Sequence, residues 1–159
     1  MSAPRWEPRT LEDHMLRSYL RRVRRAGHMG AVHVEVPFGV KRGGSARRLD
    51  AVRFPKLDNR IRRYRPEAFD EDLPGAGHIE LIEVKPKLNR PVIGQLVAAQ
   101  HLVHEEWGLR PSRALRLVAV VVEVDEALAY VCRQLGIRVE SVRYPSGQLD
   151  RVRAANTKR

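Results

Sequence analysis

The chain has 159 residues, of which 43% are hydrophobic and 31% charged, and its formal net charge is +11. This length and apolar content are those of one folded domain of roughly 100–200 residues rather than a disordered chain. The single cysteine, Cys132, excludes an internal disulfide framework and a multi-cysteine zinc site. No apolar run approaches the roughly 20 residues of a membrane span, and the first ten residues lack the hydrophobic segment of a secretory signal. We therefore expect a cytoplasmic protein with no membrane partner.

The positive charge is concentrated in three segments. Residues 1–30 carry +4, residues 41–65 carry +8 and residues 143–159 carry +4, whereas residues 66–80 carry −5. Clustered Lys and Arg favour a nucleic acid bound through its phosphates, with solvated basic surfaces as the alternative. We expect the acidic segment either to gate the functional site or to pair with the basic segments in the free protein. The candidate nucleic-acid contacts, with the aromatic ring of Tyr64 available for base stacking, are Arg21, Arg22, Arg24, Arg25, Lys41, Arg42, Arg47, Arg48, Arg60, Arg62, Arg63, Tyr64 and Lys87.

The first half of the chain predicts a helix, two strands and a long loop. Thr10, as an N-cap with Asp13 three residues later, begins an amphipathic helix over residues 11–25. Alternating valines predict a half-buried strand over residues 31–38, and a second strand follows over residues 48–54. The proline-rich residues 55–77 then predict a loop or insertion of the kind that is usually functional or mobile.

The second half predicts alternating strands and helices. The apolar sequence RLVAVVVEV is the most hydrophobic strand of the chain, so we expect it at the centre of a sheet. The predicted order α-β-β-β-α-β-α-β indicates a single α/β domain over residues 1–142, with a central mixed β-sheet flanked by helices and a basic tail over residues 143–159. In this half, the expected elements are a strand over 78–85, a helix over 91–107, a strand over 116–124, a helix capped by Asp125 that ends at Leu135, and a strand over 137–142.

Two of the predicted strands carry acids where a folded core does not favour them. Asp50 lies within an apolar strand, and Glu83 shares one face of its strand with Lys85, because strand side chains repeat every two residues. A buried carboxylate is unfavourable unless it is paired or binds a cation. Two converging carboxylates beside a lysine fit a divalent-metal site of the kind that Mg²⁺ prefers. A plain ion pair of Lys85 with either acid is the alternative.

These residues resemble the motif of the PD-(D/E)xK nuclease superfamily. The match consists of Asp50, the run Glu83-Val84-Lys85, and Gln95 in a GQL sequence at the start of the next helix. The IEVK strand, the VAVVV strand and the final GIRVESV segment resemble the RecB-like and mismatch-endonuclease branch, over residues 10–142. Two features depart from the pattern. Leucine precedes Asp50 where the name-giving motif has proline, and 32 residues separate Asp50 from Glu83.

The resemblance implies a restriction-endonuclease-like fold and metal-dependent hydrolysis of DNA phosphodiester bonds, in repair, defence or mobile-element biology. Asp50, Glu83 and the backbone carbonyl of Val84 would ligate Mg²⁺ or Mn²⁺. Lys85 would stabilise developing charge or position the attacking water, and Gln95 would orient water or a ligating carboxylate. The resemblance also implies DNA as the partner, although the residues alone do not separate DNA from RNA.

Glu12 is a third candidate metal ligand. It lies one, two and three turns from Leu16, Tyr19 and Val23, which places it on the inward side of the first helix. Many members of the superfamily carry an acid there that completes the metal site. A partly exposed first-turn glutamate is the alternative for Glu12.

Two other functions stay open for the whole chain. One is a catalytically inactive nucleic-acid-binding module, and the other is a nuclease-fold subunit of a larger complex. A homodimer is also possible.

Overall fold

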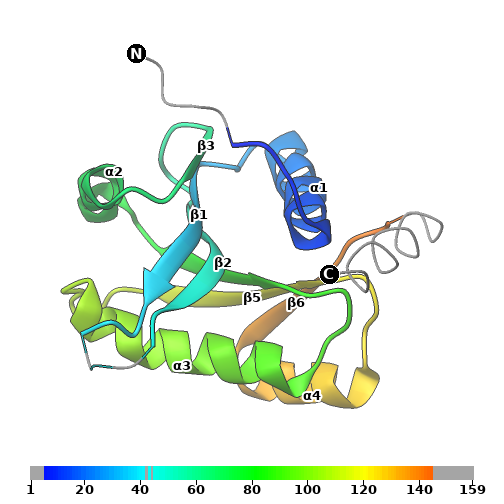
Figure 1. The fold of residues 1–159 in the computed structure, drawn as a ribbon. Helices are drawn as coiled ribbons and strands as arrows, with labels where there is room; N and C mark the ends of the chain where they lie inside the picture. The colour runs from blue at the N-terminus through cyan, green and yellow to red at the C-terminus, as the bar shows by residue number, and fades with distance from the viewer. Residues whose placement is uncertain (1–5, 42, 44, 145–159) are drawn as a thin grey trace.

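The chain folds into a mixed sheet covered by helices, in a computed structural model that describes residues 6–41, 43 and 45–144 (Figure 1). Arg42 and the part of the predicted tail over residues 145–159 lie outside the described residues. In chain order the elements are α1 (Leu11–Arg25), β1 (Ala31–Phe38), β2 (Arg47–Phe54), β3 (Arg60–Arg63), α2 (Pro66–Asp72), the 3₁₀ turn η1 (Leu73–Gly75), β4 (Ile79–Val84), α3 (Arg90–Glu106), β5 (Leu115–Val121), α4 (Glu126–Gln134) and β6 (Ile137–Ser141).

The six strands of the described region lie in the order β3-β1-β2-β4-β5-β6. β1 with β2 and β2 with β4 are antiparallel, whereas β1 with β3, β4 with β5 and β5 with β6 are parallel. The two parallel pairs formed by β4, β5 and β6 are connected through α3 and α4, as the β-α-β-α-β order predicts. The predicted fold class, a single α/β domain with a mixed sheet flanked by helices, is confirmed.

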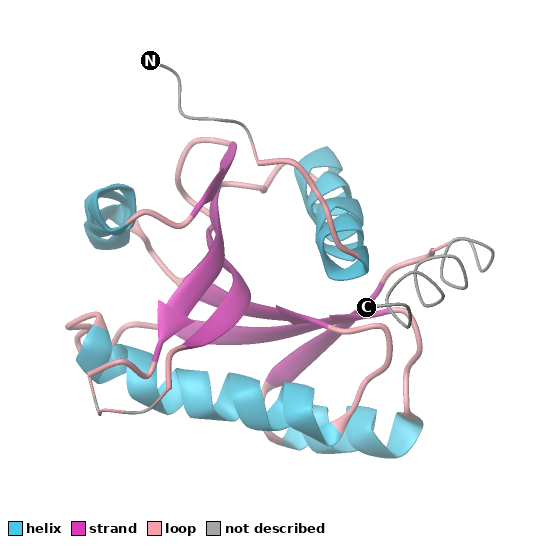
Figure 2. Cartoon of the chain, viewed as in Figure 1, coloured by secondary structure: helices cyan, strands magenta, loops and turns pink. Residues whose placement is uncertain are grey.

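The helices cover opposite faces of this sheet (Figure 2). Leu96 of α3 and Cys132 of α4 belong to one apolar cluster, and Met15 and Tyr19 of α1 belong to a second cluster on the other face. β4 lies between the two clusters, and all six of its residues are buried. Because both of its faces are covered, β4 carries apolar residues on both faces, and its two acids, Glu80 and Glu83, are buried as well.

The beginning of α1 follows its sequence signals closely. The Thr10 hydroxyl accepts a hydrogen bond from the backbone N–H of Asp13 at 3.1 Å, and the Asp13 carboxylate accepts the backbone N–H of Thr10 at 3.1 Å. This reciprocal capping box satisfies N–H groups that the first turn of a helix leaves without a partner. The predicted bounds of this helix, residues 11–25, are confirmed. No helix in the described ranges is long and apolar enough to cross a membrane.

The loop predicted over residues 55–77 is wrong, because this segment contains β3, α2 and η1. Pro66 lies in the first turn of α2, where proline needs no N–H partner and favours a helix instead of breaking it. Phe69 anchors α2 to the apolar cluster below it and lies 4.9 Å, centroid to centroid, from Trp107. β3 is a short edge strand that pairs in parallel with β1.

β1 changes faces in its middle. Alternate residues of a regular strand share a face, but Val34 contacts the α1 cluster and Val36 contacts the α3 cluster. Glu35 lies between them with φ 59°, the one positive φ among the described residues other than glycine. This conformation turns the strand, so that its first half packs under α1 and its second half under α3. The strand predicted over residues 31–38 is confirmed, but its predicted half-burial is wrong, since His33 is fully buried as well.

Candidate active site

Asp50 and Glu83 lie where β2 and β4 separate. The pairing of the two antiparallel strands ends at Ala51 opposite Ile82, so that Asp50 and Glu83 are the next residues on the two strands. The Asp50 carboxylate accepts the backbone N–H of Val84 at 2.7 Å, and the Glu83 carboxylate accepts a backbone hydrogen bond from Asp50. Each acid therefore binds the backbone of the opposite strand in place of the strand pairing that has ended, which fixes the two carboxylates beside each other.

This arrangement raises the pKa of both carboxyl groups. Burial, with a smaller contribution from the charge of Glu12, raises the pKa of Asp50 to about 6. Burial and the adjacent charge of Asp50 raise the pKa of Glu83 to about 8. Lys85 acts in the opposite direction on both groups without cancelling these effects. Low dielectric and a like charge nearby both disfavour the ionised form of a carboxyl group. The pair therefore holds a proton at neutral pH unless a cation binds.

Two other buried acids show the opposite behaviour. Burial alone would raise the pKa of Glu80, but the Arg53 guanidinium, whose Nε lies 2.7 Å from Glu80 Oε2, lowers it below its usual range. Asp72 is likewise held below its usual pKa by hydrogen bonds from His33 and Arg60, which outweigh its burial. These acids are each paired with arginine. No ion pair to Asp50 or Glu83 forms in the described part of the chain, and the nearby charge of Lys85 offsets only part of the effect of burial on their pKa values.

Lys85 and Glu12 border the two carboxylates. The Lys85 Nζ atom lies 3.9 Å from Glu12 Oε1, and both side chains are partly exposed, at 38% and 30%. The alternative ion pair of Lys85 with Asp50 or Glu83 is therefore not formed in the described structure. Glu12 is on the inward side of α1 as predicted, close enough to affect the pKa of Asp50. Over residues 6–41, 43 and 45–144, no group of three or more His, Cys, Asp and Glu side chains is arranged to hold a metal ion.

Gln95 joins β2 to the end of β4. Its amide Nε2 donates one hydrogen bond to Glu83 Oε2 at 2.8 Å and another to the backbone carbonyl of Arg48 at 2.7 Å. The start of α3 places this amide, because the Asn89 side chain caps the helix by accepting the N–H of Val92 at 3.1 Å. The structure thus brings Asp50, Glu83 and Gln95 into direct contact through backbone and side-chain hydrogen bonds.

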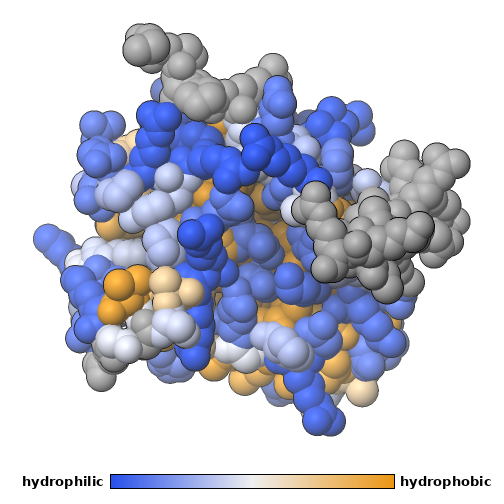
Figure 3. Space-filling model, viewed as in Figure 1, coloured by the Kyte–Doolittle hydropathy of each residue, from blue (hydrophilic) through white to orange (hydrophobic). Residues whose placement is uncertain are grey.

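The basic residues divide into paired and unpaired groups. Arg22 binds Glu140 at 2.5 Å, and Arg63 binds Glu35. Arg60 and Arg62 bind Asp72, so the acidic segment does pair with a basic one. Hydrophilic side chains cover most of the face shown in Figure 3. Among the described residues, the other predicted basic contacts form no ion pair: Arg21, Arg24, Arg25, Lys41, Arg47, Arg48 and Lys87, all of them exposed.

Tyr64 and the group around His33 differ from what the sequence indicates. Tyr64 is half-buried, and its ring packs edge-on against Phe69 at 5.4 Å between centroids, rather than standing free for stacking. The His33 Nε2 atom lies 2.8 Å from Asp72 Oδ2 inside the fold. The sequence does not predict this contact, because Asp72 lies within residues 55–77, for which the sequence predicts a loop. The available signal was Pro66, which favours the first turn of a helix, with the apolar Phe69 three residues later.

Comparisons with known proteins give a fold but no family. No protein-family model matches the chain, and no curated protein matches it. Among solved structures, the chain is similar to a repair endonuclease from Pyrococcus abyssi, with a TM-score of 0.52 and 16% sequence identity. The match covers 90% of this chain and 50% of that one, so the chain spans about half the length of this neighbour. The similarity supports a nuclease-like fold, and it does not separate one branch of the superfamily from another.

Proposed function

We propose that this protein is a metal-dependent nuclease that hydrolyses phosphodiester bonds of DNA at Asp50 and Glu83. The observation that carries the proposal is the contrast among the buried acids. Glu80 is paired with arginine, whereas Asp50 and Glu83 lie side by side with no ion pair among the described residues and have raised pKa values despite the nearby Lys85. Such a pair is costly to fold and makes sense as a ligand set for a positively charged partner.

The donor set fits a divalent cation of the Mg²⁺ type. Mg²⁺ is usually held by one or two carboxylates together with water, so two carboxylates suffice without a third acid. Asp50 and Glu83, with the backbone carbonyl of Val84, would hold Mg²⁺ or Mn²⁺. The ion, when bound, supplies Lewis-acid stabilisation of phosphate charge and lowers the pKa of water. Glu12 is not needed as a third ligand in this set, and its carboxylate instead contacts Lys85, which borders the two carboxylates.

The chain's own residues would orient the phosphodiester and the attacking water. The Lys85 ammonium, partly exposed beside the carboxylates, would bind a non-bridging phosphate oxygen and stabilise the charge that develops there. Gln95 is a positioning residue, because its two amide hydrogen bonds fix Glu83 against the start of β2. The exposed arginines and lysines that form no ion pair would contact neighbouring phosphates, which gives binding that weakens as salt rises.

A cleavage assay tests the proposal. Purified protein is incubated with supercoiled and linear DNA, and with RNA of the same sequence, with Mg²⁺, Mn²⁺ or EDTA. We expect metal-dependent cleavage of DNA that Asp50→Asn, Glu83→Gln and Lys85→Ala each reduce by at least 100-fold, with DNA binding retained. Glu71→Gln, an exposed acid on α2, is the matched control and should cleave normally. Cleavage that survives all three substitutions would overturn the assignment of the site.

A second outcome distinguishes the alternative functions. Metal binding without cleavage of any nucleic acid would favour an inactive binding module or a subunit that needs its partner. The match to half of a longer structural neighbour makes the second of these worth testing, by repeating the assay with proteins that co-purify with the chain.

A further inference from the structure

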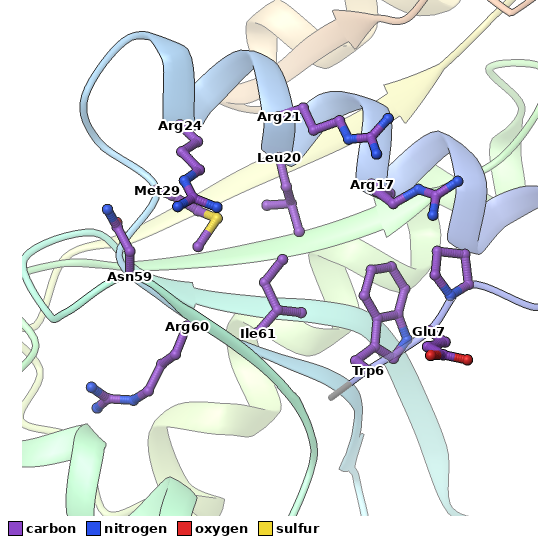
Figure 4. Close-up of a pocket in the computed structure, with 11 residues that line it drawn as sticks. Trp6, Glu7, Arg17, Leu20, Arg21, Arg24, Met29, Asn59, Arg60 and Ile61 are labelled. Atoms are coloured by element: carbon purple, nitrogen blue, oxygen red, sulfur yellow. The ribbon is translucent and has the colours of Figure 1, made fainter. Parts of the chain in front are cut away.

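A cavity of about 540 Å³ lies between α1 and the edge strand β3, away from the carboxylate pair (Figure 4). This volume is within the roughly 300–1,000 Å³ that ligand sites of proteins occupy. The segment before α1 forms one wall, α1 forms the second, and β3 forms the third. Nothing in the proposed chemistry at Asp50 and Glu83 uses it.

Apolar side chains, one of them aromatic, form part of the cavity lining. Leu20 points down from α1 and Ile61 points up from β3, with the indole of Trp6 beside them, and Met29 closes the opposite end (Figure 4). Trp6 is held firmly, since only 6% of it is exposed and it packs in the same cluster as Leu20. Only a small part of the indole therefore borders the cavity, and a partly apolar group fits against this part of Trp6 and against Ile61.

One rim of the cavity is positively charged. Arg17, Arg21 and Arg24 follow one another along α1 over about 10 Å of helix, at the helical rise of about 1.5 Å per residue. Arg21 and Arg24 form no ion pair with any described residue, and the hydrogen bond of Arg17 within the described residues joins its Nη2 atom to His14 Nδ1 at 3.1 Å. The arginines of the fold that serve structure, such as Arg53, are paired with acids. These three are instead available to an anionic ligand.

Two further residues limit what the cavity can take. Arg60 lines it as well but points away and binds Asp72, so it stabilises the wall rather than a ligand. Glu7 is an exposed acid at the end near Trp6, and its charge opposes an anion at that end. The anionic part of a ligand therefore belongs on the α1 side, and its apolar part belongs near Trp6 and Ile61.

We propose that this cavity binds one unpaired nucleotide of the nucleic-acid substrate, with the base against Ile61 and the exposed part of Trp6 and the phosphate on Arg17, Arg21 and Arg24. The inference rests on the proposed nuclease function and narrows its substrate to DNA that contains unpaired nucleotides. Helix α1 runs from the carboxylate pair to the cavity. Glu12 in its first turn contacts Lys85, and the three arginines lie about 7 to 18 Å further along the helix. At about 3.4 Å per stacked nucleotide, this corresponds to about two to five nucleotides between the cavity and the cleaved bond.

Binding of a mononucleotide tests the cavity directly. Thymidine 5′-monophosphate is titrated into the protein in EDTA while tryptophan fluorescence is recorded. We expect a saturable change that is lost in Trp6→Phe, which keeps Trp107, and an affinity about tenfold lower in Arg21→Ala. Arg133→Ala removes the same charge from α4, on the opposite face of the sheet, and should bind as the wild type does. Equal loss in Arg21→Ala and Arg133→Ala, or inorganic phosphate binding as tightly as the nucleotide, would overturn the proposal.

A DNA-binding measurement separates this inference from the proposed function. In EDTA, a duplex with a three-nucleotide single-stranded end should bind about tenfold more tightly than a blunt duplex of the same length. Arg21→Ala and Trp6→Phe should remove the preference, and Arg133→Ala should retain it. No preference in the wild type would overturn the cavity's role even if the protein cleaves DNA, whereas nucleotide binding without any cleavage would overturn the nuclease function alone.

Discussion

The raised pKa of Glu83 has a measurable effect on folding. The pKa of this carboxyl is about 8 in the folded chain, against an ordinary value of 4.5, because of burial and the charge of Asp50. A carboxyl with a raised pKa binds its proton more tightly when folded. The folded state therefore loses stability as pH rises from 4.5 to about 8, the reverse of the usual behaviour of a carboxylate that is paired with a base. Glu83→Gln, which cannot ionise, should remove this loss.

The magnitude follows from the linkage between proton binding and unfolding. Each pH unit within the window changes the free energy of unfolding by about 1.4 kcal/mol per proton. Between pH 6.5 and 8 the metal-free wild type should therefore lose about 2 kcal/mol relative to Glu83→Gln. Asp50 titrates mainly below this range, because its pKa is about 6. His33 and His78, whose pKa values are lowered by burial, contribute equally to both proteins and cancel in the comparison.

The assay is urea unfolding followed by circular dichroism, in EDTA, at four pH values from 6.5 to 8. The quantity to compare is the difference in the free energy of unfolding between Glu83→Gln and the wild type, at a constant m-value. Glu71→Gln, the exposed control, should follow the wild type. A difference that stays constant with pH would show that Glu83 does not carry the raised pKa and would refute the argument that the protein offsets its charge only in part.

Three further results follow from the structure. Gln95→Ala should lower the affinity for Mn²⁺, measured by calorimetry, or the cleavage rate by about 10–100-fold. DNA binding, measured by gel shift, should change little. An unchanged cleavage rate and Mn²⁺ affinity would contradict the positioning role of Gln95. Gly30→Ala should lower the free energy of unfolding by more than about 2 kcal/mol, because φ is +69° and a Cβ would lie 2.2 Å from the carbonyl oxygen of Phe54. Gly27→Ala, with φ +89° and open space around it, should lose about 1 kcal/mol in the same urea experiment, and equal losses would contradict the steric argument. DNA affinity should fall steeply with salt in a double-logarithmic plot, and a flat response would exclude phosphate contacts as its source.

Much of the fold could be predicted because local signals agree with the final packing. The capping box at Thr10 and the apolar face of the first helix gave its bounds, and the apolar runs gave the inner strands. The prediction failed for residues 55–77, where proline and arginine obscure the sequence pattern of a strand and a helix. Pro66 starts α2 rather than ending an element, and β3 is an edge strand with three arginines in four residues. Edge strands tolerate charge, so hydrophobic patterning gives little signal there.

The candidate site was predictable as a set of residue types but not as a geometry. An acid within an apolar strand signals a special role, which is how Asp50 and Glu83 were selected. That they face each other depends on the register of β2 with β4, across an intervening segment of 32 residues. The contact of Lys85 with Glu12 also depends on where α1 crosses the sheet. Such long-range placement is not encoded in local spacing.

The ion pairs of the arginines could not be predicted from the sequence either. Asp72 forms ion pairs with both Arg60 and Arg62 only because α2 folds back beside β3. Two of the predicted phosphate contacts are therefore occupied in the free protein. The predicted contacts on α1 that form no ion pair with described residues, Arg21, Arg24 and Arg25, are distinguished from them only in three dimensions.

Isothermal titration calorimetry with Mn²⁺ is the decisive measurement for the carboxylate pair. We expect a saturable Mn²⁺ site in the wild type at neutral pH, lost in Asp50→Asn and in Glu83→Gln and retained in Glu71→Gln. Each variant is first shown to be folded by circular dichroism. Mn²⁺ binding with unchanged affinity in both Asp50→Asn and Glu83→Gln, or no binding by the folded wild type, would contradict the proposal that this pair holds the metal.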